Sequence, residues 1–357
     1  MNFSLLNFDF LNTLSTVFYV LLAIGVLLFM VTIHELGHYT AGKILKFKIN
    51  EFSIGFGKAL WSKTNKSGEK VSLRLVPLGG YCAFEGEDEN SDNPKAFNNQ
   101  KPWKRLIVLF SGVLFNFLSA ILFSAILLTF VGYSNIVQVA SIETADWNLN
   151  TQIEVGDVIY GANGNEFSYF EDEYLSSVIA DTEIGGSIDL LIERDGVKQT
   201  VTVVKYDTTE FIDSVAVGRI GITMQNYKFN VFESFIRAFP LTVSFAYKVL
   251  YFLVMLIIGS LSLSQVGGPL TTIGAIATYT KMSFANLLVL MPLISANLAV
   301  FNLLPFPALD GARMVFVGLE WIRKKPINRK IEGYIHFGGL VVLFAFIIIV
   351  DLIHIFS

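Results

Sequence analysis

A charge-free run from Val17 to Ile33 leads directly into the sequence His34-Glu-Leu-Gly-His38. Histidines four residues apart share one face of a helix and can bind one metal ion, and Glu35 lies where such a site has its general base. A run of this length and polarity is long enough to cross a bilayer. The chain must therefore enclose a polar site that uses water at membrane depth, and this constrains its fold more than any other feature.

The composition indicates a polytopic membrane protein. Of the 357 residues, 53% are hydrophobic and 16% are charged, whereas soluble domains carry about 25% charged residues. The single cysteine, Cys82, excludes an internal disulfide and a metal site built from several cysteines. We expect the protein to be surrounded by membrane lipid and to have no nucleic-acid partner.

Four apolar segments are long enough to cross about 30 Å of hydrocarbon. They cover residues 17–44, 106–132, 287–321 and 337–356. The third contains Pro292, Pro305 and Pro307, and a proline at membrane depth frees backbone groups that only protein or a wet cavity can satisfy. We therefore expect a broken helix in the third segment, and such a break is a candidate site.

The basic residues predict the orientation of these segments. Residues 43–105 contain twelve Lys and Arg, and residues 323–330 contain five, whereas the segments before residue 17 and after residue 337 contain none. Because positive residues stay in the cytosol, both basic loops are predicted to be cytosolic and both termini extracytoplasmic. Residues 133–230, with five basic residues, then lie on the outer side.

A fifth apolar run covers residues 238–261, contains Lys248 and follows Arg237. If it crossed the membrane, His38 and Asp310 would end on opposite sides. We therefore predict an interfacial helix on the outer face, although the middle of the run is apolar nearly all round.

Two regions outside the apolar segments have strand patterns. In the outer region, residues 188–192 and 199–204 flank the turn Asp195-Gly196, and a second turn stands at Asn163-Gly164. In the cytosolic loop, residues 52–57 and 71–75 are strand-like and bounded by glycines. The unpaired edge of a small sheet beside the membrane can accept another strand.

Two histidines leave a catalytic zinc site one protein ligand short, and a carboxylate can complete it. The acids inside the apolar segments are Glu35, Asp310, Glu320 and Asp351. Asp310 follows the proline break near the inner end of its segment, at the depth of the two histidines. Glu320 lies beside Trp321 and the basic loop, which is typical of an interface anchor. Asp351 and His354 have the position of boundary residues at the end of a span.

The chain resembles the site-2 protease family of intramembrane zinc metalloproteases, in its bacterial branch typified by the regulator of sigma-E protease. The two strongest matches are His34-Glu-Leu-Gly-His38 and Asn302-Leu-Leu-Pro-Phe-Pro-Ala-Leu-Asp-Gly311. Weaker matches are Gly55-Phe-Gly57, Pro77-Leu-Gly-Gly-Tyr81, Ser111-Gly112 to Asn116-Phe117, and Ser295-Ala-Asn-Leu298. Val113 departs from the proline usual in the family, which affects the expected shape of the second span and not the chemistry.

The resemblance implies Zn²⁺ bound by His34, His38 and Asp310, with Glu35 activating water. It also implies that Asn297 and Asn302 hold an extended substrate backbone, and that the cytosolic β-hairpin pairs with the substrate. The strand that carries Val71, Leu73 and Leu75 is the expected partner. The outer region is similar to a PDZ domain, on the residues Glu154-Val-Gly-Asp-Val-Ile159, Asn163-Gly164 and Ile192-Glu-Arg-Asp-Gly196.

The predicted fold is thus a polytopic α-helical membrane protein with four transmembrane helices, a cytosolic membrane-associated β-hairpin and one inserted extracytoplasmic PDZ-like domain. The predicted parts are residues 1–45, first span; 46–104, hairpin region; 105–132, second span; 133–228, PDZ-like domain; 229–285, interfacial helix and linker; 286–322, third segment; and 323–357, basic loop and fourth span.

The expected function is that of an intramembrane zinc endopeptidase in a bacterial cytoplasmic membrane, with its active site near the cytosolic side. The expected substrates are single-span membrane proteins already cut on the outer side, such as anti-sigma factors or remnant signal peptides. The alternative is a metal-transporting or metal-sensing membrane protein, which histidines and an aspartate at membrane depth would also suit. That alternative gives Glu35 no particular role.

Overall fold

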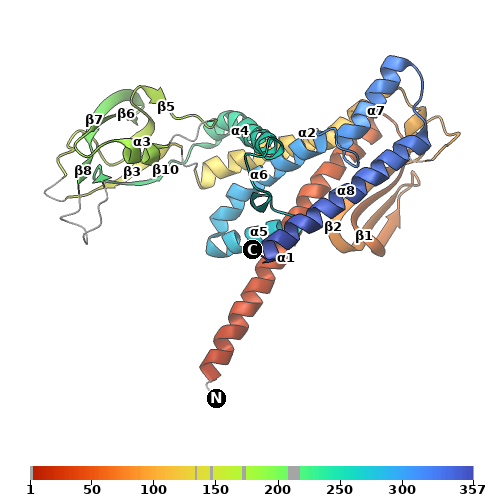
Figure 1. Cartoon of the computed structure of the whole chain (residues 1–357), viewed down its shortest axis with the longest axis horizontal. Helices are drawn as coiled ribbons and strands as arrows, with labels where there is room; N and C mark the ends of the chain where they lie inside the picture. Colours follow the sequence, from red (N-terminus) through yellow and green to blue (C-terminus); the bar gives the residue numbers. More distant parts are fainter. Residues whose placement is uncertain are drawn as a thin grey trace. The chain divides into compact units, whose positions relative to one another are not determined.

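The protein is described from a computed structural model (Figure 1). The structure describes residues 3–87, 89–132, 135–144, 148–170, 174–207 and 218–356. Parts of the predicted outer domain, residues 133–134, 145–147, 171–173 and 208–217, therefore lie outside the described residues. The chain forms two compact units: unit 1 is Met1–Phe123 with Phe245–Ser357, and unit 2 is Ser124–Ser244.

Five helices in the described residues are long and apolar enough to cross a membrane. They are α1 (Phe3–Ile44), α2 (Pro102–Phe130), α4 (Val231–Ile257), α6 (Phe284–Leu303) and α8 (Arg329–Phe356). Four of them cover the predicted spans. The fifth, α4, covers most of the run predicted to be interfacial. By length and composition alone, the described residues therefore contain one more candidate span than the four that the sequence analysis predicted.

The third predicted segment is broken into two helices, as expected from its prolines. α6 ends at Leu303, α7 (Asp310–Arg323) begins at Asp310, and Leu304 between them is extended. Pro305 and Pro307 fall in this gap, where a proline cannot supply the N–H that a continuous helix requires. Pro292, also predicted to interrupt the segment, lies inside α6. The break therefore comes directly before Asp310 and sets the start of α7.

A shorter helix, α5 (Pro269–Met282), occupies part of the predicted linker and packs against α1 and α6. Its N-terminus is held by Asp351 of α8. The Asp351 carboxylate accepts hydrogen bonds from the Thr271 backbone N–H at 3.2 Å and hydroxyl at 3.0 Å. The first N–H groups of a helix have no partner within it, and a carboxylate also suits the positive end of the helix dipole. Asp351, predicted to be a boundary residue, is buried and joins α8 to α5.

Glu320, predicted as an interface anchor, is instead the buried centre of an ion-pair network. Its carboxylate contacts Arg105 of α2 at 2.5 Å and Arg329 of α8 at 2.8 Å. Glu320 and Arg105 are 6% and 3% exposed, so neither charge could be left alone at this depth without a large cost. The network fixes α7 between α2 and α8.

The loop predicted to be cytosolic forms a long hairpin of β1 (Ile49–Thr64) and β2 (Lys70–Phe84) beside the C-terminal part of α1, followed by the 3₁₀ turn η1 (Phe97–Asn99) (Figure 1). The hairpin folds back on itself, because residues 51–54 are in register with both 80–83 and 70–73. Residues 70–74 in turn pair with 59–64. The paired segments therefore follow the order 59–64, 70–74, 51–54, 80–84.

Phenylalanines attach this hairpin to the helices. Phe47, Phe84 and Phe97 are buried with ring centroids 5.6–5.8 Å apart. They pack in one cluster with Val108 of α2 and Val317 of α7. The apolar contact places the end of β2 against both helices that flank the candidate site.

Unit 2 contains a six-stranded antiparallel sheet with the strand order β10-β3-β4-β6-β7, and β5 paired to β4. Its elements are β3 (Val137–Ile142), β4 (Val158–Ala162), β5 (Asn165–Glu166), α3 (Leu175–Asp181), β6 (Ser187–Arg194), β7 (Val197–Val204) and β10 (Ile222–Asn226); β8 (Tyr206–Asp207) pairs separately with β9 (Gly218–Arg219). Asp195 and Gly196 have φ of 51° and 78°, as the predicted two-residue hairpin turn requires. One apolar core covers this sheet.

Candidate metal centre

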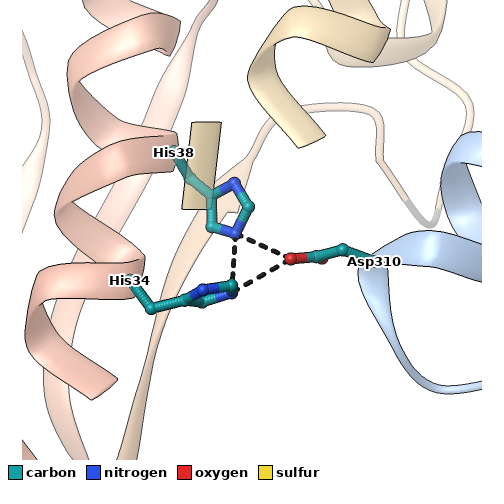
Figure 2. A group of neighbouring side chains, drawn as sticks. All are labelled: His34, His38 and Asp310. Carbon is teal, nitrogen blue, oxygen red and sulfur yellow. Dashed lines mark hydrogen bonds and ion pairs between the residues drawn. The ribbon is translucent and has the colours of Figure 1, made fainter. Parts of the chain in front are cut away.

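The two histidines of α1 and the aspartate at the start of α7 converge on one point (Figure 2). Asp310 Oδ2 lies 3.0 Å from His34 Nε2 and 3.1 Å from His38 Nε2, and the two Nε2 atoms are 3.1 Å apart. Both histidines are buried. Among the described residues, these three form the group of possible ligands that lies close enough to share one metal ion.

The triangle fits a Zn²⁺ site with three protein ligands. Zinc bonds of about 2.0–2.1 Å in a tetrahedral arrangement place neighbouring ligand atoms roughly 3.3 Å apart. The three distances of 3.0–3.1 Å are close to that value. Two imidazole nitrogens and one carboxylate oxygen leave the fourth position for water or substrate, as catalytic zinc sites require.

Helix α2 shapes this triangle from one side. The Val108 carbonyl is 2.8 Å from Nδ1 of His38 and accepts a hydrogen bond from its N–H, which leaves Nε2 of that ring free to bind a metal. One turn later stands Gly112, where an added Cβ would lie 2.5 Å from Nε2 of His38 and 2.7 Å from Cε1 of His34. Only a glycine permits the two histidine rings to lie this close to α2.

Glu35 and the triangle face a common cavity of about 660 Å³ in unit 1. Glu35 is partly exposed and makes no hydrogen bond or ion pair with any described residue. Its carboxylate is therefore available to take up a proton. The residues that line the cavity besides Glu35 and the three ligands include Phe56, Gly80, Tyr81, Cys82, Ala83, Phe84, Glu87, Asn116, Leu298, Asn302 and Arg313.

Cys82 lines the cavity but is not suited to bind the metal. Burial, together with the nearby charges of Glu35 and Glu87, raises the pKa of its thiol. The thiol therefore remains protonated at neutral pH, whereas a metal-binding cysteine must be a thiolate.

The structure brings some of the predicted substrate-binding residues to the cavity and not others. Asn302 lines it, with its amide donating to the Leu298 carbonyl at 3.0 Å. Asn297 is exposed on α6 and is not part of the lining. Val71, Leu73 and Leu75 are also absent from the lining.

The hairpin segment beside the three candidate ligands is 80–84 and not 71–75. Residues 71–73 are paired on both sides, with 52–54 and with 61–63. Within the part of the chain that the structure describes, residues 80–84 have strand partners only at 49–54, and they also line the cavity. Residue periodicity within one strand cannot reveal which segment becomes the edge, because the fold-back of the hairpin decides it.

The sequence analysis assigned no role to Gly112 or Asn116. Asn116 is completely buried, and its side-chain amide lies 3.2 Å from Nδ1 of His34. Both belong to the stretch from Ser111 to Phe117, which carried a weak family match. Their four-residue spacing with Val108 was a usable signal, since it places all three on one face of α2.

Comparison with known proteins assigns the family. The profile described as Peptidase family M50 matches residues 22–346. Proteins named as zinc metalloproteases from Fusobacterium nucleatum and Nostoc sp. are 30% and 32% identical, and the alignments cover 93% and 91% of this chain and 96% and 92% of those proteins. The zinc metalloprotease RasP of Oceanobacillus iheyensis is 28% identical, over 94% of this chain and 98% of its own. The chain therefore belongs to peptidase family M50, the site-2 protease family of zinc metalloproteases, whose metal is Zn²⁺.

Proposed function

We propose that the protein is an intramembrane endopeptidase that cuts the transmembrane segments of single-span membrane proteins. The observation that carries this proposal is the position of the His34, His38 and Asp310 triangle. It lies near the C-terminal end of the apolar helix α1 and opens into a cavity lined by both polar and apolar groups. A peptidase built on this site would meet its peptide bonds at membrane depth.

The residues of this chain divide the work as follows. The imidazoles of His34 and His38 and the carboxylate of Asp310 would hold Zn²⁺, which would polarise the scissile carbonyl and make water more acidic. Glu35 takes the proton from the attacking water and delivers it to the leaving nitrogen. Asn302, at the wall of the cavity, offers its amide to the substrate backbone.

A transmembrane helix has to unwind before a protease can reach its peptide bonds, because each carbonyl and N–H is engaged within the helix. We assign the partner for the unwound substrate to residues 80–84 of β2, which among the described residues pair only with 49–54 and which line the cavity. An extended substrate added there would satisfy its backbone groups by strand addition. In this proposal, residues 80–84 make the substrate contacts that the sequence analysis predicted for Val71, Leu73 and Leu75.

The proposal includes the orientation expected from the basic loops. Both termini and the sheet of unit 2 would be extracytoplasmic, with the metal centre near the cytosolic side of a bacterial inner membrane. Substrates already cut on the outer side, such as anti-sigma factors or remnant signal peptides, would have only a small extracytoplasmic part. The sheet of unit 2 would act as a PDZ-like domain toward the outer end of the substrate.

The catalytic role of Glu35 is tested with Glu35→Gln in membrane-inserted, zinc-loaded protein and a panel of single-span reporters. Loss of a general base slows catalysis by about 10²- to 10⁴-fold, and we expect zinc content to stay at the wild-type level. Glu89→Gln, in an exposed part of the cytosolic loop, is the control and should cleave normally. Undiminished cleavage by Glu35→Gln would refute the mechanism.

The substrate edge is tested by disulfide cross-linking in the uncleaving Glu35→Gln protein. Cys82 is the only cysteine of the chain, so single cysteines placed along a reporter segment report on contact with β2. Cross-strand neighbours lie close enough for a disulfide, so we expect a strong cross-link at the reporter position opposite Cys82, weaker ones two residues away and none at the adjacent positions. The control protein, Cys82→Ser with Leu73→Cys, should give none. A three- to four-residue repeat, typical of a helix, would contradict strand addition.

The alternative of metal transport or sensing has no specific observation in its favour. It leaves unexplained why Glu35, a carboxylate without a hydrogen bond among the described residues, stands in the same cavity as the ligands.

A further inference from the structure

His34 has a second ring nitrogen, Nδ1, which lies 3.2 Å from the side-chain amide of Asn116 on α2. Its Nε2 faces His38 and Asp310. A bound Zn²⁺ takes the lone pair of Nε2, so the proton of the neutral ring is on Nδ1. Nδ1 is then a hydrogen-bond donor, and the group opposite it must be an acceptor.

The amide of Asn116 can provide this acceptor. Its side chain is completely buried, and Oδ1 has no hydrogen-bond partner among the described residues. The oxygen and the NH₂ of an amide are nearly equal in shape, so a half-turn of the group exchanges them. This exchange breaks no hydrogen bond to Oδ1. It replaces two facing donors with an Nδ1–H···Oδ1 hydrogen bond.

The main chain of Asn116 is held by two helices. Its carbonyl accepts hydrogen bonds from Ser119 Oγ at 2.9 Å and from Ser295 Oγ of α6 at 2.8 Å. Two turns earlier on the same face of α2, the Val108 carbonyl accepts from Nδ1 of His38. Each of the two histidines therefore has a polar group of α2 beside its Nδ1, a main-chain carbonyl at His38 and a side-chain amide at His34.

We propose that Asn116 is a positioning residue, which accepts a hydrogen bond from Nδ1–H of His34 and thereby fixes the ring in the tautomer and orientation that bind Zn²⁺ through Nε2. The proposal rests on the metal site assigned above. Removing such an outer hydrogen bond weakens metal binding by about 10- to 100-fold. The acceptor of His38 is a backbone carbonyl and survives any substitution, so Asn116 is the position at which this effect can be measured.

The test is the Zn²⁺ affinity of the full-length protein in detergent, measured by competition with a chelator of known affinity. Asn116→Leu keeps the size of the side chain and removes the acceptor, and should weaken binding by about 10- to 100-fold. Asn116→Asp keeps an acceptor and should bind Zn²⁺ with nearly wild-type affinity. Ser124→Ala is the matched control. It removes another buried hydrogen bond of α2, to Thr242 at 3.0 Å, and should leave the affinity unchanged.

Equal affinities of the wild type and Asn116→Leu would overturn the proposal. Equal losses in Asn116→Leu and Asn116→Asp, or a loss of the same size in Ser124→Ala, would also overturn it, because they would indicate general damage to helix packing. If the wild type itself did not bind Zn²⁺, the proposed function would fail together with this inference.

Discussion

At the scale of single residues, the metal centre depends on the absence of a side chain at Gly112 of α2 as much as on its three ligands. Gly112 lies between the turns that carry Val108 and Asn116, and the rings of His34 and His38 occupy the space where its side chain would be. Protein interiors are packed too densely to accept an additional methyl group at 2.5 Å from a ring atom. The histidines therefore reach Asp310 only because this position has no Cβ.

Gly112→Ala is accordingly expected to displace at least one histidine and to reduce bound Zn²⁺ below one ion per chain, with parallel loss of cleavage. The measurement is zinc content of the purified protein by elemental analysis. Gly25→Ala, in α1, is the control, because an added Cβ there meets no atom within 4 Å. Full zinc occupancy in Gly112→Ala would show that the rings can shift without leaving the metal.

At the scale of elements, the hairpin is stabilised by a small polar core between its paired segments. Glu51 accepts hydrogen bonds from Ser72 Oγ at 2.5 Å and from Arg74 Nη2 at 2.7 Å, and Arg74 also donates to Ser53. Burial opposes the ionisation of Glu51, but the hydrogen bonds from Ser72 and Arg74 outweigh it and hold its pKa below the usual value. The charged form of Glu51 thus supports the fold-back that exposes the edge at residues 80–84.

The pH dependence follows from the sign of this shift. A carboxyl group whose pKa is lower in the folded than in the unfolded state, about 4.3 for glutamate, stabilises the fold above that pH and loses its contribution as the pH falls below it. Amide hydrogen exchange of the hairpin should therefore be slower in the wild type than in Glu51→Gln at neutral pH. The difference should shrink as the pH drops below about 4.3. A difference that does not change with pH would exclude the charge of Glu51 as its cause.

At the scale of the whole molecule, the contact between α1 and α7 restricts the path of the chain. His38 near the end of α1 and Asp310 after the end of α6 meet at the metal centre, so the two helices end on the same side. Lys281, at the end of α5, donates to Asn12 and Thr16 near the start of α1, so α6 begins on the opposite side. If α4 crossed the membrane, α5 would have to bring the chain back across it. Its 14 residues span only about 21 Å of the roughly 30 Å required.

We therefore expect α4 to begin and end on the outer side, in spite of its length. In a Cys82→Ser protein, Ser260→Cys just after α4 should react with a membrane-impermeant maleimide in intact cells. Lys325→Cys, in the basic loop after α7, should react only after the membrane is opened. Labelling of Ser260→Cys that requires an opened membrane would mean that α4 crosses, and that the orientation of α6 has to be revised.

Much of the candidate site was predictable because its rules are local. The four-residue spacing of His34 and His38 fixes their common face, and the burial of unpaired charge in an apolar helix is too costly without a metal. The proline pair before Asp310 predicts the end of a helix for the same kind of local reason. The predictions that the structure changed, among them the substrate edge at 71–75, concern long-range packing. Each required a choice among several similar segments of the chain.

The sequence by itself thus determined the membrane class of the chain, the metal-binding face of α1 and the carboxylate candidates. Only the tertiary structure decided that Asp310, 276 residues after His34, closes the triangle, that residues 80–84 form the edge at the cavity, and that Gly112 and Asn116 adjoin the histidines. The physical reason is that hydrophobic periodicity and helix spacing act over a few residues, whereas contacts between distant segments depend on how whole helices and strands pack. The role of a buried polar atom such as Oδ1 of Asn116 can be inferred only from the residues that pack around it.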